Sequence, residues 1–338
     1  MAKRTIQRDP ELLAHQEWLG YLQPVGLVVA PAAMQDAGWV VTRSGSELIE
    51  RQERYRESLE ALGSDEEADA EDRELGFSSI ETLLVDHLGW SSDQVQSDPN
   101  LIEGYTRELP ELGETLQPSA VVPAAISEGV QLLVQELPLL TPLDQKVTGG
   151  EHLWRASAQE RFERLLRETG VEAGLLFNGS QLRLVVAPKG ESSGHITFSL
   201  KDLAAVSGRL MFSGLDLLLG QSHVFLDPDG YRLADVLRKS RSFQAVVSNA
   251  LADQVLAALW ELLRGFQQAD ELTERQGSLL LGHLAEDEPK QLYGGLITVL
   301  MRLVFLLYAE DNALLPKDAV YEHGITPILW TVVRAPRV

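Results

Sequence analysis

The sequence predicts a protein of class α+β (α/β), on the basis of three observations. Apolar residues recur at helical spacing in a stretch before residue 112 and again after residue 228. Between these stretches, short β-rich runs surround one strong helix pattern. A chain of 338 residues exceeds one ordinary core. We therefore expect four regions: a helical 1–112, an α/β 113–227, a helical 228–316 and an atypical tail, 317–338.

The N-terminal region carries a charged helix pattern over residues 44–62, with Ser46 as its expected N-cap. Residues 64–74 form an acidic block without apolar residues to bury, which indicates a surface loop. A second, short amphipathic helix is predicted over residues 79–88.

The middle region predicts a sheet crossed by one helix. The expected helix spans residues 157–169 and stops at Gly170. Asn178 and Gly179 are typical of a type I′ turn, so the third and fourth strands should be antiparallel. The expected strands are 120–123, 131–135, 173–177, 182–187 and 195–199.

The C-terminal region predicts one long helix over residues 240–270 and an apolar helix over residues 292–308. The second helix is short for a membrane span and carries Arg302 near its middle. We therefore expect a helix buried in protein, with Glu310 or Asp311 as the carboxylate that pairs with Arg302.

Composition limits the functions open to the chain. Its 29 basic and 50 acidic residues give a net charge of −21, which disfavours autonomous tight DNA binding. No cysteine occurs, so disulfides and thiolate zinc sites are excluded. The N-terminus has no apolar signal segment. We expect a cytoplasmic protein without a membrane partner.

Three segments resemble the N-terminal region of type IIG restriction-modification enzymes, which combine an endonuclease and an adenine methyltransferase in one chain. They are LMRLVFLLYAEDNALLP (300–316), FERLLRETGVEAGLLFNGSQLRLVVAPKGESSGH (162–195) and HQEWLGYLQPVGLVVAP (15–31). The last is similar to members from phage-defence systems such as DISARM. The resemblance covers roughly residues 10–320, and it implies double-stranded DNA as the partner of the full-length enzyme.

The methyltransferase signatures of that family are absent from this sequence. It contains no Asn-Pro-Pro-Tyr or Asp-Pro-Pro-Tyr tetrapeptide and no acidic Gly-rich loop for S-adenosylmethionine. The resemblance implies a methyltransferase domain after Pro316, where the tail 317–338 is unlike the family. We therefore expect a truncated product without its own cofactor.

Many relatives carry a PD-(D/E)xK nuclease on an α-β-β-α-β core, in which two acidic residues bind Mg²⁺ and a lysine polarises water. The corresponding positions here are Ser119, Gln135 and Leu137, so the resemblance implies a degenerate, inactive nuclease core. The alternative that these strands never belonged to a nuclease stays open. Candidate residual carboxylates are Glu81, Glu114 and Glu136.

Other signals are weak. His152, His195 and His223 lack the spacing of a zinc site and read as surface or loop residues. The glycine-rich residues 190–194 precede a strand pattern, which favours a hairpin over a phosphate loop. The best basic cluster, a candidate DNA contact, consists of Arg238, Lys239 and Arg241.

These observations favour a non-catalytic, DNA-associated scaffold portion of a restriction-modification or phage-defence adenine methyltransferase. One alternative is a metal-dependent nuclease that binds Mg²⁺ through a migrated site. Another is an inactive truncated gene product. If the chain is such a scaffold, it is not an enzyme by itself.

The purified protein should not bind S-adenosylmethionine, because no segment supplies the glycine-rich turn and acidic ribose partner of such a site. Isothermal titration calorimetry checks this expectation. Saturable binding at micromolar ligand would contradict it.

Overall fold

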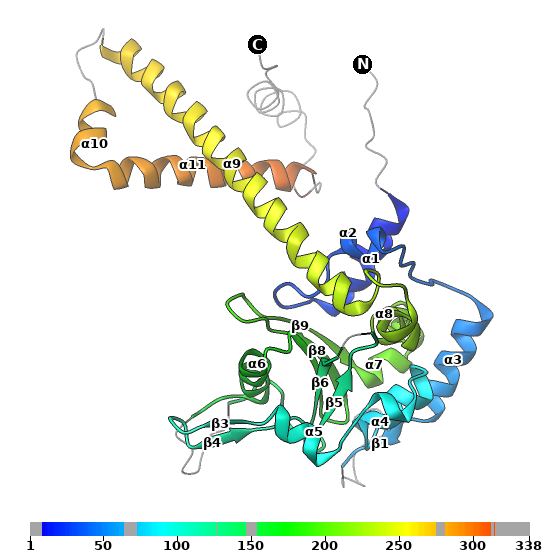
Figure 1. Ribbon diagram of the computed structural model, residues 1–338. Coiled ribbons are helices and arrows are strands. Elements are labelled where there is room, and N and C mark those ends of the chain that lie inside the picture. The colour runs from blue at the N-terminus through cyan, green and yellow to red at the C-terminus, as the bar shows by residue number, and fades with distance from the viewer. Residues whose placement is uncertain are drawn as a thin grey trace. The chain divides into compact units, whose positions relative to one another are not determined.

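The computed structural model describes residues 9–63, 73–126, 128–146, 154–274, 281–311 and residue 314. It combines helices with β-sheet, so the predicted α+β class is confirmed (Figure 1). The chain divides into two compact units, Met1–Ala245 and Val246–Val338. The first unit contains the sheet and both cavities considered below.

The centre of the first unit is a five-stranded sheet with the order β5-β6-β7-β8-β9. All neighbouring strands are antiparallel except β6 and β7, which are parallel and are joined through the helix α6. All five predicted strands are present. Their bounds are β5 (Ala120–Pro123), β6 (Val130–Glu136), β7 (Ala173–Phe177), β8 (Gln181–Val186) and β9 (Gly194–Ser199).

Helix α6 (Ala158–Thr169) forms as predicted, with a complete capping box at its start. The Ser157 hydroxyl accepts from Glu160 N at 3.2 Å, and the Glu160 carboxylate accepts from Ser157 N at 2.8 Å. Gly170 ends the helix in the left-handed conformation, at φ 78°. The buried side of α6 carries Phe162, Leu165 and Leu166, which pack on one face of the sheet.

The β7–β8 hairpin is antiparallel, as predicted, but its turn is not of type I′. That turn needs positive φ at both central residues, and only Gly179 has it, at 92°. The Asn178 side chain instead accepts from Ser180 N at 3.2 Å and Gln181 N at 2.7 Å. A side-chain hydrogen bond therefore shapes this turn, as asparagine commonly does.

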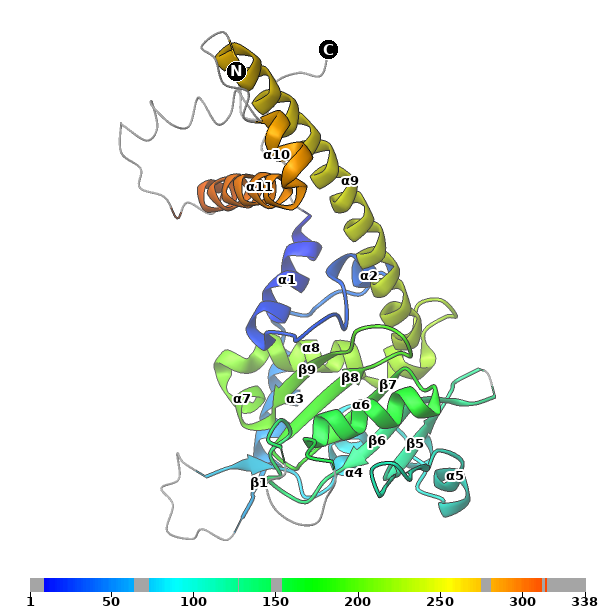
Figure 2. The ribbon, with the colours of Figure 1, turned by 90° about the vertical axis from the view of Figure 1, so that its left-hand side faces the viewer.

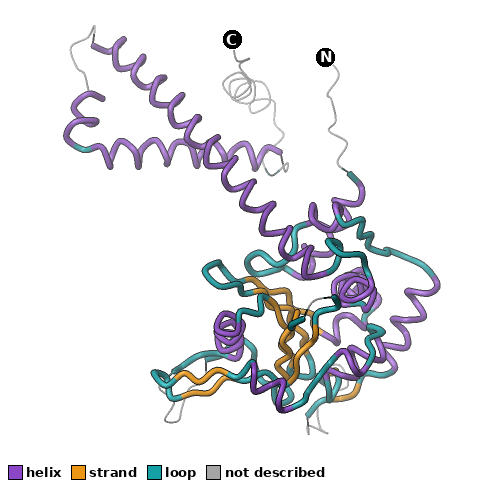
Figure 3. The backbone as a smooth tube through the Cα atoms, in the orientation of Figure 1, coloured by secondary structure: helices purple, strands orange, loops and turns teal. Residues whose placement is uncertain are grey.

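The opposite face of the sheet is covered by helices from both before and after it in the sequence (Figures 2 and 3). Large side chains of the N-terminal region, such as Trp18 and Tyr55, share one core with Leu175 and Leu184 of the sheet. Residues on both sides of position 112 therefore belong to one packed unit. The covering helices are α1 (Pro10–Leu22), α2 (Pro31–Asp36), α3 (Ser46–Glu57), α4 (Ile80–Thr82), α7 (Leu200–Ala204) and α8 (Arg209–Leu219).

Smaller elements complete the first unit. Short hairpins pair β1 (Glu60–Ala61) with β2 (Leu75–Gly76) and β3 (Arg107–Leu109) with β4 (Glu114–Leu116). The remaining elements are η1 (Leu83–His87), η2 (Ser92–Gln94), α5 (Pro99–Gly104), η3 (Val206–Gly208) and η4 (Ser222–Leu226).

Two helices predicted in the N-terminal region form with altered ends. Helix α3 begins at Ser46, so its N-cap is Gly45 and the prediction of Ser46 as the cap is wrong. The expected second helix consists of α4, capped by Ser79, and the single π-turn η1. Most of the acidic block, residues 64–72, lies outside the described residues.

The long C-terminal helix is confirmed and is longer than predicted, because α9 spans Leu233–Glu274. It is followed by α10 (Leu281–Asp287) and α11 (Pro289–Asp311). The atypical tail, residues 317–338, lies outside the described part of the chain.

The prediction that α11 is buried with an internal ion pair is wrong for Arg302, which is exposed. Helix α11 packs against α10 and buries Leu296 and Ala309, whereas Phe305 is 67% exposed. The reason is that the helix is apolar around most of its circumference and its described neighbours cover only part of it. The side chains of Glu310 and Asp311 lie outside the described residues.

By length and composition, the stretch Pro289–Ala309 of α11 could cross a membrane, and 11% of its apolar window is buried. Core helices of soluble proteins share this length and composition.

Gly174→Ala should destabilise the protein, because β7 packs directly beneath α6. A Cβ at Gly174 would lie 2.5 Å from Phe162 Cζ and 2.6 Å from Leu133 O. We expect a loss of about 1 to 3 kcal/mol in the free energy of unfolding, the usual cost of overpacking. Urea denaturation measures this loss.

The matched control is Gly104→Ala in α5, where an added Cβ meets no described atom within 4 Å. An equal effect of the two substitutions would contradict the close packing at Gly174.

Candidate functional site

The structure brings Ser119 and Gln135 together, as the nuclease-like frame predicts. Ser119 precedes β5, and its N donates to Val134 O of β6 at 2.8 Å. The Ser119 hydroxyl accepts from Glu136 N at 3.0 Å and from Gln135 Nε2 at 3.4 Å. Ser119 and Gln135, the positions to which the resemblance assigns the two carboxylates, are therefore adjacent here, and they hold a hydroxyl and an amide.

Gln135 and Leu137 line a cavity of about 500 Å³ between the end of β6 and helix α6. None of its lining residues is acidic, and two, Lys146 and Arg161, are basic. Mg²⁺ prefers carboxylate and other oxygen ligands, so this lining suits the ion poorly. The other lining residues are Thr115, Leu116, Gln117, Thr141, Pro142, Gln145, Ala158, Phe162 and Leu165.

Glu136 points away from this cavity, as its position in the strand predicts. Its carboxylate accepts from Ile80 N at 3.1 Å, at the start of α4 on the opposite face of the sheet. Glu114 lies on the α6 side, where it accepts from Arg161 Nη2 at 2.9 Å. Glu81 is exposed at the first turn of α4.

The three residual carboxylates are thus not gathered at one point. Among the residues that the structure describes, no group of three or more histidine or acidic side chains is placed to hold a metal ion.

A buried arginine in the sheet was not anticipated from the sequence. The Arg183 side chain on β8 is 5% exposed and makes a bidentate ion pair with Asp144, at 2.6 and 2.8 Å. It also donates to Gln159 Oε1 at 3.1 Å and to Thr197 Oγ1 at 2.8 Å. The hydrogen bonds from Arg183 hold the pKa of the Asp144 carboxyl below its ordinary value.

Arg183 fixes the loop that forms one wall of the cavity, because Asp144 lies in that loop beside Gln145 and Lys146. The sequence signal was present. A single arginine interrupts the otherwise apolar residues 182–186 of β8, and its neighbours Leu182 and Leu184 point to the other face. A charged residue at such a position requires an ionic or hydrogen-bonding partner.

The predicted basic cluster is held by carboxylates. Arg238 pairs with Asp235 at 3.0 Å, Lys239 with Asp36 at 3.2 Å, and Arg241 with Glu191 at 2.8 Å. These pairs occupy the charges that a DNA phosphate would use.

The histidines and the glycine-rich segment, which gave only weak functional signals in the sequence, do not form a common site. His195 lies on β9 and His223 in η4, where it pairs with Asp227 at 2.6 Å, and His152 lies outside the described residues. Burial and the Arg183 charge lower the pKa of His195. The glycine-rich segment 190–194 is the turn of the β8–β9 hairpin, as predicted.

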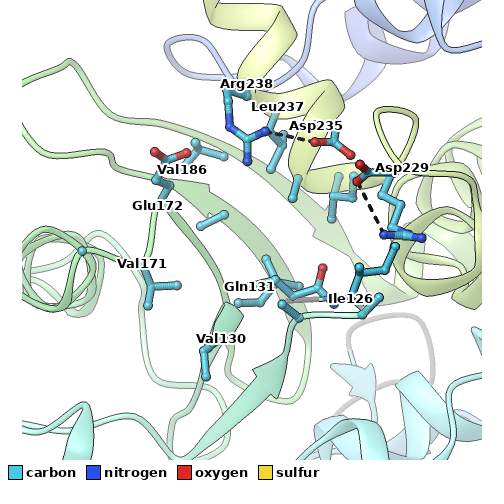
Figure 4. A pocket seen from close by; sticks show the side chains of 18 of the residues that line it. Ile126, Val130, Gln131, Val171, Glu172, Val186, Asp229, Asp235, Leu237 and Arg238 are labelled. Atoms are coloured by element: carbon cyan, nitrogen blue, oxygen red, sulfur yellow. Dashed lines mark hydrogen bonds and ion pairs between the residues drawn. The ribbon is translucent and has the colours of Figure 1, made fainter. Parts of the chain in front are cut away.

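A second cavity, of about 520 Å³, lies at the other end of β6, beside the first turns of α9 (Figure 4). It is lined on one side by apolar residues such as Val130 and Val186, and on the other by Arg232, Arg238 and Arg241. Arg238 and Arg241 belong to the basic cluster predicted from the sequence, whereas Arg232 and the cavity were not predicted.

No protein-family model, curated protein or solved structure matches this chain. The family suggested by residues 15–31, 162–195 and 300–316 therefore stays an expectation.

Asp144→Asn should weaken the protein at neutral pH, because it leaves the buried Arg183 guanidinium without its counter-ion. The Asp144 side chain is 66% exposed, so water replaces part of the pair and we expect a loss of only about 1 kcal/mol. Asp93→Asn, at an exposed position outside this cluster, is the control.

The effect should depend on pH. Because folding lowers the pKa of Asp144, the pair stabilises the folded state fully above the unfolded value of about 4. This stability is lost as pH falls through the lower folded pKa. The melting temperatures of the wild type and of Asp144→Asn, measured between pH 7 and 2.5, should therefore converge as the pH falls. A difference that persists unchanged would contradict the assignment.

Proposed function

We propose that this chain is a non-catalytic, DNA-associated scaffold portion of a restriction-modification or phage-defence adenine methyltransferase. The observation that carries the proposal is the contact between Ser119 and Gln135, of which Gln135 lines the cavity between β6 and α6. It supports a nuclease-like core that cannot cut DNA.

The order of elements supports the same view. A helical segment, two antiparallel strands, a crossover helix and a parallel strand occur in this order as α4, β5, β6, α6 and β7, with η1, η2, α5, β3 and β4 between α4 and β5. This is the α-β-β-α-β order expected for the nuclease core. Within this order, the Ser119 and Gln135 side chains contact each other where β5 and β6 pair.

The chemistry of the pair explains why no cleavage is expected. A divalent ion gives up part of its tightly held hydration shell on binding, and negatively charged ligands offset that cost. A serine hydroxyl and a glutamine amide carry no such charge. Leu137, at the position of the lysine, cannot polarise an attacking water.

A DNA-associated role without catalysis also agrees with the charge of the chain. With a net charge of −21, attraction to the phosphate backbone has to come from other parts of a full-length enzyme or from a partner subunit. In this proposal the unit that contains the five-stranded sheet holds the other parts of the full-length enzyme in position. The cluster Arg238, Lys239 and Arg241 supplies at most local contacts, made after its carboxylate partners exchange for phosphate.

Restoring the three missing side chains tests the proposal. The variant Ser119→Asp, Gln135→Glu and Leu137→Lys should bind Mn²⁺ or Mg²⁺ saturably in calorimetry, because the two new carboxylates would be adjacent and the one at position 135 would line the cavity. The wild type should bind neither ion detectably and should not nick plasmid DNA in the presence of Mg²⁺.

The matched control is Ser119→Asn with Leu137→Lys, which keeps nearly the same shapes without the two negative charges. If it binds metal as well as the restored variant does, or if the restored variant folds without binding metal, the nuclease-like assignment fails. Circular dichroism establishes that each variant is folded. Mg²⁺-dependent nicking by the wild type would favour the migrated-site alternative.

A further inference from the structure

We propose that helix α11 pairs with α11 of a second copy of this chain, in antiparallel orientation, through an exposed apolar seam. The seam consists of Ile297, Met301, Val304 and Tyr308. It lies wholly within the second compact unit, whereas the nuclease-like core belongs to the first. This inference therefore does not depend on the proposed function.

The seam has the spacing of a coiled coil. Its residues follow one another at intervals of four, three and four positions, which places them at alternating a and d positions of a heptad. Met301 is 61% exposed, Val304 51% and Tyr308 60%. Leu296 and Ala309, which are buried, lie on other sides of the helix. The described neighbours of α11 therefore leave the seam open to solvent.

The seam is complementary to itself. When two copies are antiparallel about a point between residues 302 and 303, Met301 of each copy lies opposite Val304 of the other. Ile297 of each copy then lies opposite Tyr308. Every seam position thus meets another seam position, as an isologous twofold interface requires. Each layer also joins a longer side chain to a shorter one, which favours interdigitation.

The exposed apolar area is sufficient for a specific interface. Tyr293 and Phe305 flank the seam and are 60% and 67% exposed. Together with Met301, Val304 and Tyr308 they expose on the order of 500 Å² in each copy, because a large aromatic side chain covers about 150 to 250 Å². Two copies would bury about 1,000 Å², which is near the lower limit for a specific association. We therefore expect a reversible dimer.

Charge favours the antiparallel arrangement over a parallel one. The exposed acidic run Glu286, Asp287 and Glu288 comes directly before α11. In a parallel pair, the runs of the two copies would lie side by side and repel each other. An antiparallel pair places these runs at opposite ends of the interface. It also places the positive end of each helix dipole near the negative end of the other.

The charges of this region also favour a second copy over a membrane. Helices that lie on a membrane surface carry lysine or arginine beside their apolar face, whereas residues 286–288 are acidic. Arg302 is the one charged residue between Gln291 and Ala309, and it is exposed on a side of the helix away from the seam. A membrane span would bury this charge, which is costly. The proposed dimer leaves it in water.

Sedimentation velocity on the full chain tests the proposal. We expect the wild type to pass reversibly from monomer to dimer as its concentration rises through the micromolar range. Met301→Glu should weaken the dimer at least tenfold, because it brings two carboxylates together beside the twofold axis. The matched control is Arg302→Glu, which adds the same side chain one position along the helix and away from the seam. It should leave the Kd within threefold.

Engineered cysteines test the orientation, because the chain has no cysteine of its own. Ile297→Cys mixed with Tyr308→Cys should form a disulfide-linked dimer on mild oxidation. Neither variant should cross-link with itself. In the antiparallel register, two copies of one of these positions are eleven residues apart along the helix, or about 16 Å at a rise of 1.5 Å per residue. That separation is too large for a disulfide.

A wild type that stays monomeric up to submillimolar concentration would overturn the proposal. So would equal Kd values for Met301→Glu and Arg302→Glu, or self-cross-linking of either single-cysteine variant, which would indicate a parallel pair. Flotation of the wild type, but not of Met301→Glu, with phosphatidylcholine vesicles would assign the seam to a membrane instead. Circular dichroism establishes that each variant is folded, and the cysteine experiment decides the question if Met301→Glu does not fold.

Discussion

The structure depends on one constraint, which is that strands β7 and β8 are buried on both faces. Every residue of β7 is buried, as is every residue of β8 except its first. Such strands are stable only when both faces of the sheet are covered. Helix α6 covers one face. The other face needs more surface than the segments after the sheet supply, so the N-terminal helices complete the layer and their large aromatic side chains pack against the sheet.

On the α6 face, the charged side chain of Arg183 holds the loop after β6, which the apolar core does not fix in place. Arg183 holds Asp144 at one end of the loop after β6. Asn178 holds the other end, since its Nδ2 donates to Thr141 O at 2.9 Å and its O accepts from Leu140 N at 2.8 Å. The wall of the cavity between β6 and α6 is therefore attached to the β7–β8 hairpin at two points. A surface loop becomes a fixed part of the cavity without an apolar core of its own.

The sequence predicts local features of this fold well, because they rest on local chemistry. The five strands and α6 follow from hydrophobic periodicity, a Ser157 cap and a Gly170 stop. The adjacency of Ser119 and Gln135 follows from the antiparallel register of β5 and β6. Features that depend on partners distant in sequence were not predictable in this way. The periodicity of α11 cannot reveal how much of it is covered, and nothing near Arg183 identifies Asp144 as its partner. The cavity beside α9 likewise combines segments more than 100 residues apart.

The two edges of the sheet have a further consequence for solubility. The outer strand β5 is bridged by Gln96, which exchanges two hydrogen bonds of 2.9 Å with Val121. On the other side, Val25 exchanges hydrogen bonds of 3.0 and 2.8 Å with His195 of β9. An exposed strand edge is a template for pairing with other chains, and a single bridge interrupts that template. The N-terminal region, besides covering a face, thus stands in the way of strand exchange between molecules and of fibrillar aggregation through either edge.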